Sequence, residues 1–375
     1  MAMLDVIGLM SGTSLDGVDA AMIATDGDTI ASFGPSVFLP YSSDEQAKLR
    51  AATGQWQDGD AAILDAAREI VHDRHLAALS QLPKADLLGF HGQTLAHDPA
   101  LGRTHQLGDG AAIARRSRTS TVWDFRSEDM RQGGQGAPLV PFFHYALARQ
   151  AAWNAPVAFI NIGGVANVTW LDPARQDLSE TNTILAFDSG PGNALVNDFM
   201  LARTGLSFDN HGLLASRGTA DSAMVAEWLK VDYFRETPPK SLDRNSFQVL
   251  LDDLTTVGTE DGLASLTLFT ARSIGLAARQ FPRPVEKVII CGGGRNNLEI
   301  LRLLKNEFSA KVVTAEQCGL DGDMLEAQAF AYLAARFARE LPTTSPATTG
   351  ARQPVCGGII SKYDADIENS LMPRR

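Results

Sequence analysis

Short apolar runs separated by turns rich in glycine, serine and aspartate dominate the pattern of this chain. Residues 6–10 and 18–23 are apolar and flank the polar turn 11–17, which predicts a strand, a tight turn and a second strand. Residues 157–171 have the same layout, with Gly163 and Gly164 in the turn. Two such units, one early and one in mid-chain, indicate two related halves.

Apolar residues at helical spacing fill much of the sequence between the predicted strands. Residues 42–79 predict one or two amphipathic helices, and residues 261–279 predict a long one. The alternation of helices with short apolar strands favours an α/β architecture with a largely parallel sheet. Further strands are predicted at 85–90, 121–125, 184–188 and 288–291, and further helices within 106–116, 298–308 and 321–338.

A chain of 375 residues is long for a single core, so two domains are expected. Residues 126–141 are charged, then glycine-rich, then apolar, as in a segment that crosses between domains. The predicted domains are 1–130 and 131–339, with part of 340–375 packing back on the first. Residues 230–247 read as a polar surface loop, and the polar end of the chain is expected to be partly disordered.

The charge balance and the apolar runs exclude several classes of partner. A formal net charge of −11 disfavours nucleic acid and anionic membranes. No apolar run approaches the ~20 residues that span a bilayer, and the N-terminus has no leader pattern, so a cytoplasmic location is expected. The three cysteines lack CxxC spacing and predict free thiols.

The first turn carries the chemistry of a phosphate site. Gly12 and Gly17 permit positive φ and close approach of a ligand. Backbone N–H groups with Thr13 and Ser14 can bind phosphate, and the Asp16 carboxylate can hold the accompanying Mg²⁺. The same residues also suit an ordinary hairpin turn. A P-loop is excluded, because Val18 and Asp19 stand where it needs Lys and Ser or Thr.

Five further polar residues are candidates for catalysis or binding. Asp188, expected at the end of a strand, suits a general base or an Asx turn in the following SGPG. His91 suits a substrate contact or a structural histidine. Arg126 and Asp129 suit an anionic or polyhydroxylated substrate, or a salt bridge. Glu326 lies among apolar neighbours and needs a partner, either from the protein or from a ligand.

The segment CGGGRNN, residues 291–297, resembles a dinucleotide fingerprint only superficially. Asn297 stands where GxGxxG requires its third glycine, so NAD binding is excluded. A glycine-rich turn between a strand and a helix suits close approach of an adenosine. It equally suits a simple connection.

Taken together, the motifs resemble one family. GLMSGTSLDGVDA, FHGQT, GGQGAPLVP, NIGGVANVT, FDSGPGN and CGGGRNN occur in order from residue 8 to residue 297, and DGDMLEAQAFAYLA extends the match to residue 334. This set is similar to the anhydro-N-acetylmuramic acid kinase family of the actin/hexokinase-type superfamily. The sequence departs from the family pattern after Gly358, where its polar end is longer than expected.

The resemblance implies a fold and a reaction. The fold is α/β, with two actin/hexokinase-like (ribonuclease H-like) domains and an ATP and sugar cleft between them. The reaction converts 1,6-anhydro-N-acetylmuramic acid, water and Mg·ATP to N-acetylmuramic acid 6-phosphate and ADP, in peptidoglycan recycling. A homodimer is also implied.

The resemblance also implies roles for individual residues. Asp188 matches the base that activates water, a role that suits an ionised Asp of ordinary pKa, about 3.9. Asp16 matches a Mg²⁺ ligand, directly or through water. The ATP-binding residues implied are Gly12, Thr13, Ser14, Leu15, Asp16, Gly17, Val18, Asp19, Gly164, Gly293 and Gly294, and the substrate-binding residues are His91, Arg126, Asn161 and Glu326.

Three other functions stay open at this stage. The substrate could be another anhydrosugar such as levoglucosan, although Arg126 favours one that bears a carboxylate. The same fold supports phosphohydrolases, which release phosphate without any sugar, and non-catalytic assembly proteins. Sugar-dependent release of ADP separates a kinase from a phosphohydrolase.

Overall fold

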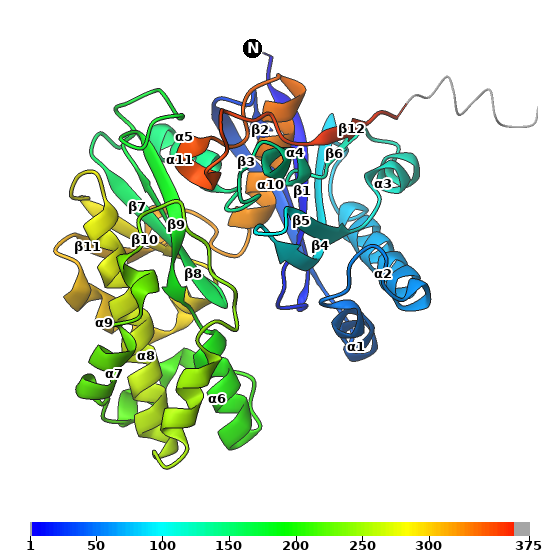
Figure 1. Ribbon diagram of the computed structural model, residues 1–375. Helices are drawn as coiled ribbons and strands as arrows, with labels where there is room; N and C mark the ends of the chain where they lie inside the picture. The colour runs from blue at the N-terminus through cyan, green and yellow to red at the C-terminus, as the bar shows by residue number, and fades with distance from the viewer. Residues whose placement is uncertain (1, 364–375) are drawn as a thin grey trace, which may run out of the picture. The chain divides into compact units, whose positions relative to one another are not determined.

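The computed structural model describes residues 2–363 and divides into two compact units, each built around one β-sheet (Figure 1). Unit 1 contains residues 2–152 together with 324–363 of the described chain, and unit 2 contains Trp153–Asp323. The boundaries therefore differ from the predicted 130/131 and 339/340. Residues 131–152 and the helix at 325–338 belong to unit 1, because both pack with its elements.

The unit 1 sheet has the order β12-β6-β4-β1-β2-β3, and β5 pairs with β4. β1, β4 and β6 run parallel, whereas β2 and β3 continue from β1 as an antiparallel meander. The carboxyl ends of β1, β4 and β6 therefore meet at one edge. The strands are β1 (Leu4–Ser11), β2 (Gly17–Thr25), β3 (Ile30–Pro40), β4 (Leu87–Asp98), β5 (Arg103–Leu107), β6 (Thr121–Trp123) and β12 (Ile359–Ser361).

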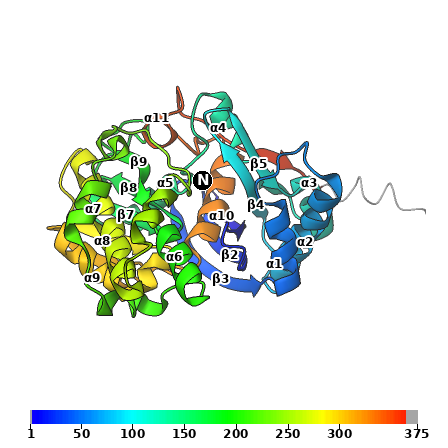
Figure 2. The same cartoon turned by 60° about the horizontal axis from the view of Figure 1, so that its bottom comes forward.

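Alternation along β1 assigns its side chains to two different faces. Ile7 and Leu9 join a buried cluster with α2 and α3. Gly8 faces α10 on the other side, where an added Cβ would overlap the Ala327 carbonyl oxygen. Figure 2 shows α2 and α10 on opposite sides of this sheet. The helices are α1 (Ser43–Ala52), α2 (Ala61–Leu79), α3 (Gly110–Ser117), α4 (Ser127–Arg131), α5 (Pro141–Gln150), α10 (Leu325–Ala338) and α11 (Pro346–Thr349).

The unit 2 sheet has the order β11-β10-β7-β8-β9. β7, β10 and β11 are parallel, and β8 is antiparallel to both β7 and β9. Apolar residues of α8 and α9 cover one face of this sheet, and a second apolar cluster joins α6, α7 and α8. The elements are β7 (Val157–Ile162), β8 (Val165–Leu171), β9 (Ile184–Pro191), β10 (Lys287–Cys291), β11 (Lys311–Thr314), α6 (Ala194–Thr204), α7 (Ser222–Trp228), α8 (Thr259–Ala277) and α9 (Leu298–Glu307).

The two sheets share one topology. In each, a three-stranded antiparallel meander is extended by two parallel strands beside its first strand, so β3-β2-β1-β4-β6 corresponds to β9-β8-β7-β10-β11. This is the strand order of the predicted ribonuclease H-like domain, and the predicted α/β class with two such domains is confirmed. The predicted largely parallel sheet was wrong, because both sheets are mixed and antiparallel pairings outnumber parallel ones. Within the described residues, no helix has the length and apolar character needed to cross a bilayer.

Four local predictions were wrong or incomplete. β4 does not end at Phe90 but continues through the HGQT motif, because β5 supplies it with an antiparallel partner. Residues 126–141 do not cross between units. The predicted surface loop 230–247 buries Lys240. The strands β3, β5, β11 and β12 and the helices α4, α5, α6, α7 and α11 were not predicted. Of the end expected to be partly disordered, residues 364–375 lie outside the described part of the chain.

Candidate functional site

In unit 1 the first turn is shaped by its own residues and braced from β4. The Asp16 carboxylate accepts hydrogen bonds from the Ser14 hydroxyl at 2.7 Å and the Gly17 amide at 3.1 Å. The turn needs positive φ at Leu15, whose backbone takes φ 58°. Thr13, Ser14 and Asp16 are exposed, whereas the side chains of Leu15 and Val18 are buried in the core. Only backbone atoms of Leu15 and Val18 remain to meet a ligand.

Gln93 of the HGQT motif connects this turn to β4. Its Oε1 accepts a hydrogen bond from the Ser11 hydroxyl at 2.6 Å, and its Nε2 donates to the Gly12 carbonyl at 3.1 Å. Gln93 is buried, so these bonds fix the start of the turn from inside the sheet edge. Sequence reasoning assigned no role to this residue.

His91, Arg126 and Glu326 come together in unit 1. The Arg126 guanidinium donates to His91 Nε2 at 3.0 Å, so this nitrogen accepts and His91 carries its proton on Nδ1, 2.9 Å from the Gly92 carbonyl. Burial and the Arg126 charge hold the pKa of His91 well below its ordinary value, so His91 is a neutral hydrogen-bond acceptor. Burial raises the pKa of Glu326, and the nearby positive charge of Arg126 opposes this increase.

Arg126 has few donors left for a ligand. Besides the bond to His91, Nη1 donates to the Gly136 carbonyl at 2.7 Å. Nε is buried and has no hydrogen-bond partner within the described residues. Burial lowers the pKa of Arg126 to about 10, opposed by Glu326 and Asp129, and the group stays cationic near neutral pH. The side chain thus presents charge rather than a free two-pronged fork for a substrate carboxylate.

Asp129 is a structural residue rather than a substrate contact. Its carboxylate is fully buried and accepts hydrogen bonds from the Gly136 amide at 2.7 Å and the Thr349 hydroxyl at 2.6 Å. The Thr344 hydroxyl donates to it as well. Asp129 therefore joins the glycine-rich loop after α4 to the chain that follows α10.

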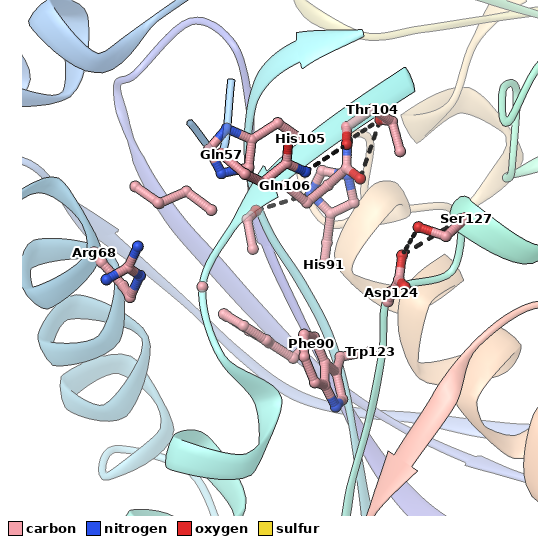
Figure 3. A pocket seen from close by; sticks show the side chains of 13 residues that line it. Gln57, Arg68, Phe90, His91, Thr104, His105, Gln106, Trp123, Asp124 and Ser127 are labelled. Atoms are coloured by element: carbon pink, nitrogen blue, oxygen red, sulfur yellow. Dashed lines mark hydrogen bonds between the residues drawn. The ribbon is translucent and has the colours of Figure 1, made fainter. Parts of the chain in front are cut away.

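A cavity of about 290 Å³ opens in unit 1 between α2, β5 and the residues after β6 (Figure 3). Figure 3 shows Phe90 and Trp123 near one another, Arg68 to one side, and Gln106 beside Thr104. Of the residues predicted to bind substrate, His91 lines this cavity. The cavity is lined by Gln57, Arg68, Phe90, His91, Gly92, Thr104, His105, Gln106, Leu107, Gly108, Trp123, Asp124 and Ser127.

In unit 2 the second glycine turn is bonded to the turn that follows Asp188. The amides of Gly192 and Asn193 donate to the carbonyls of Gly164 and Gly163 at 2.9 and 2.7 Å. A Cβ added at Gly164 would make ordinary van der Waals contact with the Arg244 side chain at 3.7 Å and with Ala194 at 3.8 Å, so a methyl group would fit without a clash. The structure thus places the Gly164 turn and the Asp188 strand in one rigid cluster.

Asp188 lies within β9 rather than at its end. The Leu242 amide donates to Asp188 Oδ2 at 2.8 Å, the Asp188 amide donates to the Lys240 carbonyl at 3.1 Å, and the Tyr233 hydroxyl donates to the Asp188 carbonyl at 2.6 Å. The carboxylate is thus bonded to the 230–247 segment, and not to the SGPG turn that the Asx alternative required. Burial raises the pKa of Asp188 to about 7, opposed by the Leu242 amide and the Lys240 charge.

In the glycine-rich turn of residues 291–297, one glycine is required by packing and another borders open space. An added Cβ at Gly294 would overlap the Ile162 side chain, so packing against β7 already explains this glycine. Gly293 has no atom within 4 Å of an added Cβ. Asn161 pairs with Cys291, and its Oδ1 lies against Gly292. A cavity of about 480 Å³ begins directly after the turn, at Arg295 and Asn296.

Comparison with known proteins decides the family. The model of the family described as anhydro-N-acetylmuramic acid kinase matches residues 4–363. The chain belongs to this family. It is 48% identical over 359 residues to the anhydro-N-acetylmuramic acid kinase of Cereibacter sphaeroides, covering 96% of each chain. It is 46% identical to that of Roseobacter denitrificans, covering 96% of this chain and 94% of the other, and 42% identical to that of Rhodopseudomonas palustris, covering 96% and 100%. The predicted family is confirmed.

The residues present fit the Mg²⁺ that a kinase of this family implies. Asp16 is exposed beside two hydroxyl residues, and Mg²⁺ characteristically takes one or two carboxylates together with phosphate oxygens and water. Within residues 2–363 no group of three His, Cys, Asp or Glu side chains forms a metal cage. An isolated carboxylate is the kind of ligand that a metal carried by a nucleotide needs.

Sequence reasoning missed three residues that form hydrogen bonds or charge interactions with Asp188. Tyr233, Lys240 and Leu242 act on Asp188 from a segment that looked like a surface loop. Prolines and charges made this segment appear exposed, and nothing in its spacing pointed to a strand about 50 residues earlier.

Proposed function

We propose that the protein converts 1,6-anhydro-N-acetylmuramic acid, ATP and water to N-acetylmuramic acid 6-phosphate and ADP, as a step in the recycling of cell-wall sugar. Membership of the anhydro-N-acetylmuramic acid kinase family, over residues 4–363, is the observation that carries this proposal. A kinase activity on this sugar is what the names of relatives that span nearly the whole chain state.

The proposed reaction couples two bond exchanges. Water attacks the anomeric carbon, the bond from this carbon to the bridging oxygen breaks, and the water proton passes to Asp188 and then to solvent. The released oxygen at position 6 takes the γ-phosphoryl group, and ADP leaves. Phosphoryl transfer needs positioning and charge neutralisation, and no covalent intermediate with the protein is required.

Asp188 is suited to this role by rigidity and by basicity. The Leu242 amide holds one carboxylate oxygen, so the other remains to accept a proton. Its raised pKa, about 7, makes the carboxylate a stronger base than the ordinary Asp that the sequence suggested. The carboxylate is the reactive form, so activity should rise as pH increases through this value.

ATP binding is assigned to three glycine turns. In unit 1, Gly12, Thr13, Ser14 and Asp16 would bind phosphate groups, with Asp16 holding Mg²⁺. In unit 2, Gly164 and Gly293 are assigned to the nucleotide by the resemblance. The exposed hydroxyls of the first turn and the open space at Gly293 support this assignment. Bound Mg²⁺ would neutralise phosphate charge.

Sugar binding is assigned to His91, Arg126 and Glu326 in unit 1 and, by the resemblance, to Asn161 in unit 2. The first three form one electrostatic cluster, in which Arg126 is the cation and His91 the neutral acceptor. The cationic Arg126 supports an acidic sugar over a neutral one. A homodimer, implied by the resemblance, and a cytoplasmic location, expected from the sequence, complete the proposal, and sedimentation of the purified protein tests the dimer.

Product analysis by mass spectrometry in oxygen-18 water tests the proposal. The protein is incubated with Mg·ATP and anhydro-N-acetylmuramic acid, and with levoglucosan in parallel. The expected product from the acidic sugar is a 6-phosphate with one heavy oxygen at the anomeric carbon, absent from Asp188→Asn. ADP that appears without any sugar would instead establish a phosphohydrolase. Equal turnover of levoglucosan would contradict the proposed preference for an acidic sugar.

A further inference from the structure

Lys240 is a buried cation on the segment that holds Asp188. Its side chain belongs to a residue only 8% exposed, which is unusual for lysine. Burial lowers its pKa, whereas the charges of Glu236 and Asp188 raise it. Taking an ammonium group out of water is costly unless nearby groups compensate. The position of this cation therefore calls for an explanation beyond packing.

Contacts around the ammonium fix its place beside the base. Nζ donates to the Tyr233 carbonyl at 2.8 Å and lies 4.3 Å from the centre of the Tyr233 ring. It also lies 5.8 Å from the centre of the ring of Phe187, the residue before Asp188 in β9. Attraction to aromatic faces keeps a desolvated cation charged. The ammonium therefore contacts both the 230–247 segment, through Tyr233, and strand β9, through Phe187.

The backbone of Lys240 is bonded to the same residue that its charge influences. Its carbonyl accepts from the Asp188 amide at 3.1 Å, and two residues later the Leu242 amide donates to the Asp188 carboxylate at 2.8 Å. Tyr233, whose carbonyl holds Nζ, donates its hydroxyl to the Asp188 carbonyl. A shift of Lys240 would therefore displace the carboxylate itself.

We propose that Lys240 is a positioning residue for the Asp188 base: its ammonium favours the ionised carboxylate, and its anchored side chain keeps the carboxylate oriented. This inference rests on the role of Asp188 in the proposed function. The charged and titratable groups that interact with Asp188 are Lys240 and Tyr233, and Glu236 acts in turn on both of these. Burial raises the pKa of Tyr233, so its phenol stays neutral. Glu236 is exposed, which leaves Lys240 as the buried charge.

The test is the dependence of kcat/KM on pH for wild type, Lys240→Met and Lys240→Arg, with anhydro-N-acetylmuramic acid as the varied substrate. kcat/KM reports ionisation of the free enzyme. Removal of a nearby opposite charge should raise the pKa of the base, so the acid limb for Lys240→Met should move up by about 1 pH unit. At pH values below the pKa of the base, this shift lowers kcat/KM of the variant by roughly a further tenfold relative to wild type. Lys240→Arg should restore the limb.

Lys287→Met is the matched control. Lys287 also lies over an aromatic ring of unit 2, with Nζ 4.2 Å from the centre of the Trp153 ring, but it does not act on Asp188. Its limb should coincide with that of wild type. Thermal unfolding of each variant checks the fold, and Lys240→Gln, which keeps a hydrogen-bond donor, replaces Lys240→Met if that variant does not fold.

The outcomes separate this inference from the proposed function. If Lys240→Met loses activity equally at every pH and the acid limb of its kcat/KM profile does not move, Lys240 has only a structural role and the inference is overturned. A limb displaced as far in Lys240→Arg as in Lys240→Met would also overturn it. Wild-type activity in Asp188→Asn would instead show that Asp188 is not the base, and would contradict the proposed mechanism.

Discussion

Replacement of Asp129 by Ala should release two segments of unit 1 at once. The carboxylate accepts hydrogen bonds from the Gly136 amide and from the Thr344 and Thr349 hydroxyls, all in a fully buried place. A buried donor left without a partner costs about 1–3 kcal/mol. For three donors, with allowance for relaxation, we expect a loss of about 4 kcal/mol in local stability. That is a large part of the roughly 5–15 kcal/mol that stabilises a domain.

Hydrogen exchange measured by mass spectrometry is the appropriate assay, because a protein of two units does not give a single free energy of unfolding. A loss of about 4 kcal/mol corresponds to roughly 10³-fold faster exchange where the slowest amides open locally. The effect should appear in peptides covering residues 129–139 and 343–352, with peptides of unit 2 unchanged. The KM for the sugar should rise too, because Arg126 donates to the Gly136 carbonyl in the released loop.

Asp73→Asn is the control for loss of a carboxylate on unit 1. Asp73 pairs with Arg116 at 2.6 Å, and the two side chains are 64% and 45% exposed. Such a surface pair contributes about 0–1 kcal/mol, so exchange should change little. Exchange in Asp129→Ala within threefold of wild type in both peptides would refute the reasoning, since three buried donors would then have found other partners.

Three further results are expected from other positions. Asp188→Asn should stabilise the protein at high pH: folding raises the pKa of this acid from 3.8 to about 7, so the stability it contributes is present below pH 3.8 and lost as pH rises through 7. A stability difference of up to about 4 kcal/mol should therefore open between pH 4 and pH 7, visible as a higher Tm of the variant. Gly8→Ala should lower Tm sharply or prevent folding, because the new methyl group overlaps the Ala327 carbonyl oxygen of α10. Gly293→Ala should leave Tm unchanged and raise the KM for ATP, because the methyl group enters open space assigned to the nucleotide, whereas Gly294→Ala should lower Tm through its clash with β7.

Each of these results has an outcome that would contradict it. A Tm difference between wild type and Asp188→Asn that is constant from pH 4 to pH 8 would show that the carboxyl is not desolvated. Wild-type Tm in Gly8→Ala would mean that α10 can move away from β1 at little cost. An unchanged KM for ATP in Gly293→Ala would place the nucleotide elsewhere.

Local patterns were sufficient to predict most of the elements. The two strand–turn–strand units and the helices at 61–79, 259–277 and 298–307 follow from apolar periodicity and from capping residues such as Asn297, whose side chain accepts from the Glu299 and Ile300 amides. Pairing with distant strands is not encoded locally, so β12 and the extension of β4 through His91 were missed. The unit boundaries were displaced for the same reason: α10 is bound to unit 1 through tertiary packing.

The candidate site was predictable as a set of residues and not as a set of interactions. The motifs indicated Asp188, but its pKa is raised by burial and lowered by Leu242 and Lys240, which are more than fifty residues away in sequence. Arg126 was expected to contact a substrate or to form a salt bridge, and the structure shows it donating hydrogen bonds to His91 and to the Gly136 carbonyl. Partners distant along the chain decide protonation and donor availability, so sequence spacing alone could not supply them.

The discontinuity of unit 1 bears on how the chain matures during synthesis. Unit 2, Trp153–Asp323, is one uninterrupted stretch and has its whole sheet as soon as residue 323 has been made. Unit 1 begins to emerge first, yet one face of its sheet awaits α10, and β6 awaits its neighbour β12. An unfinished sheet with an apolar face and an open edge is prone to wrong association. The first half of the protein to be translated is therefore the last to be completed, and dependence on chaperones should concentrate there.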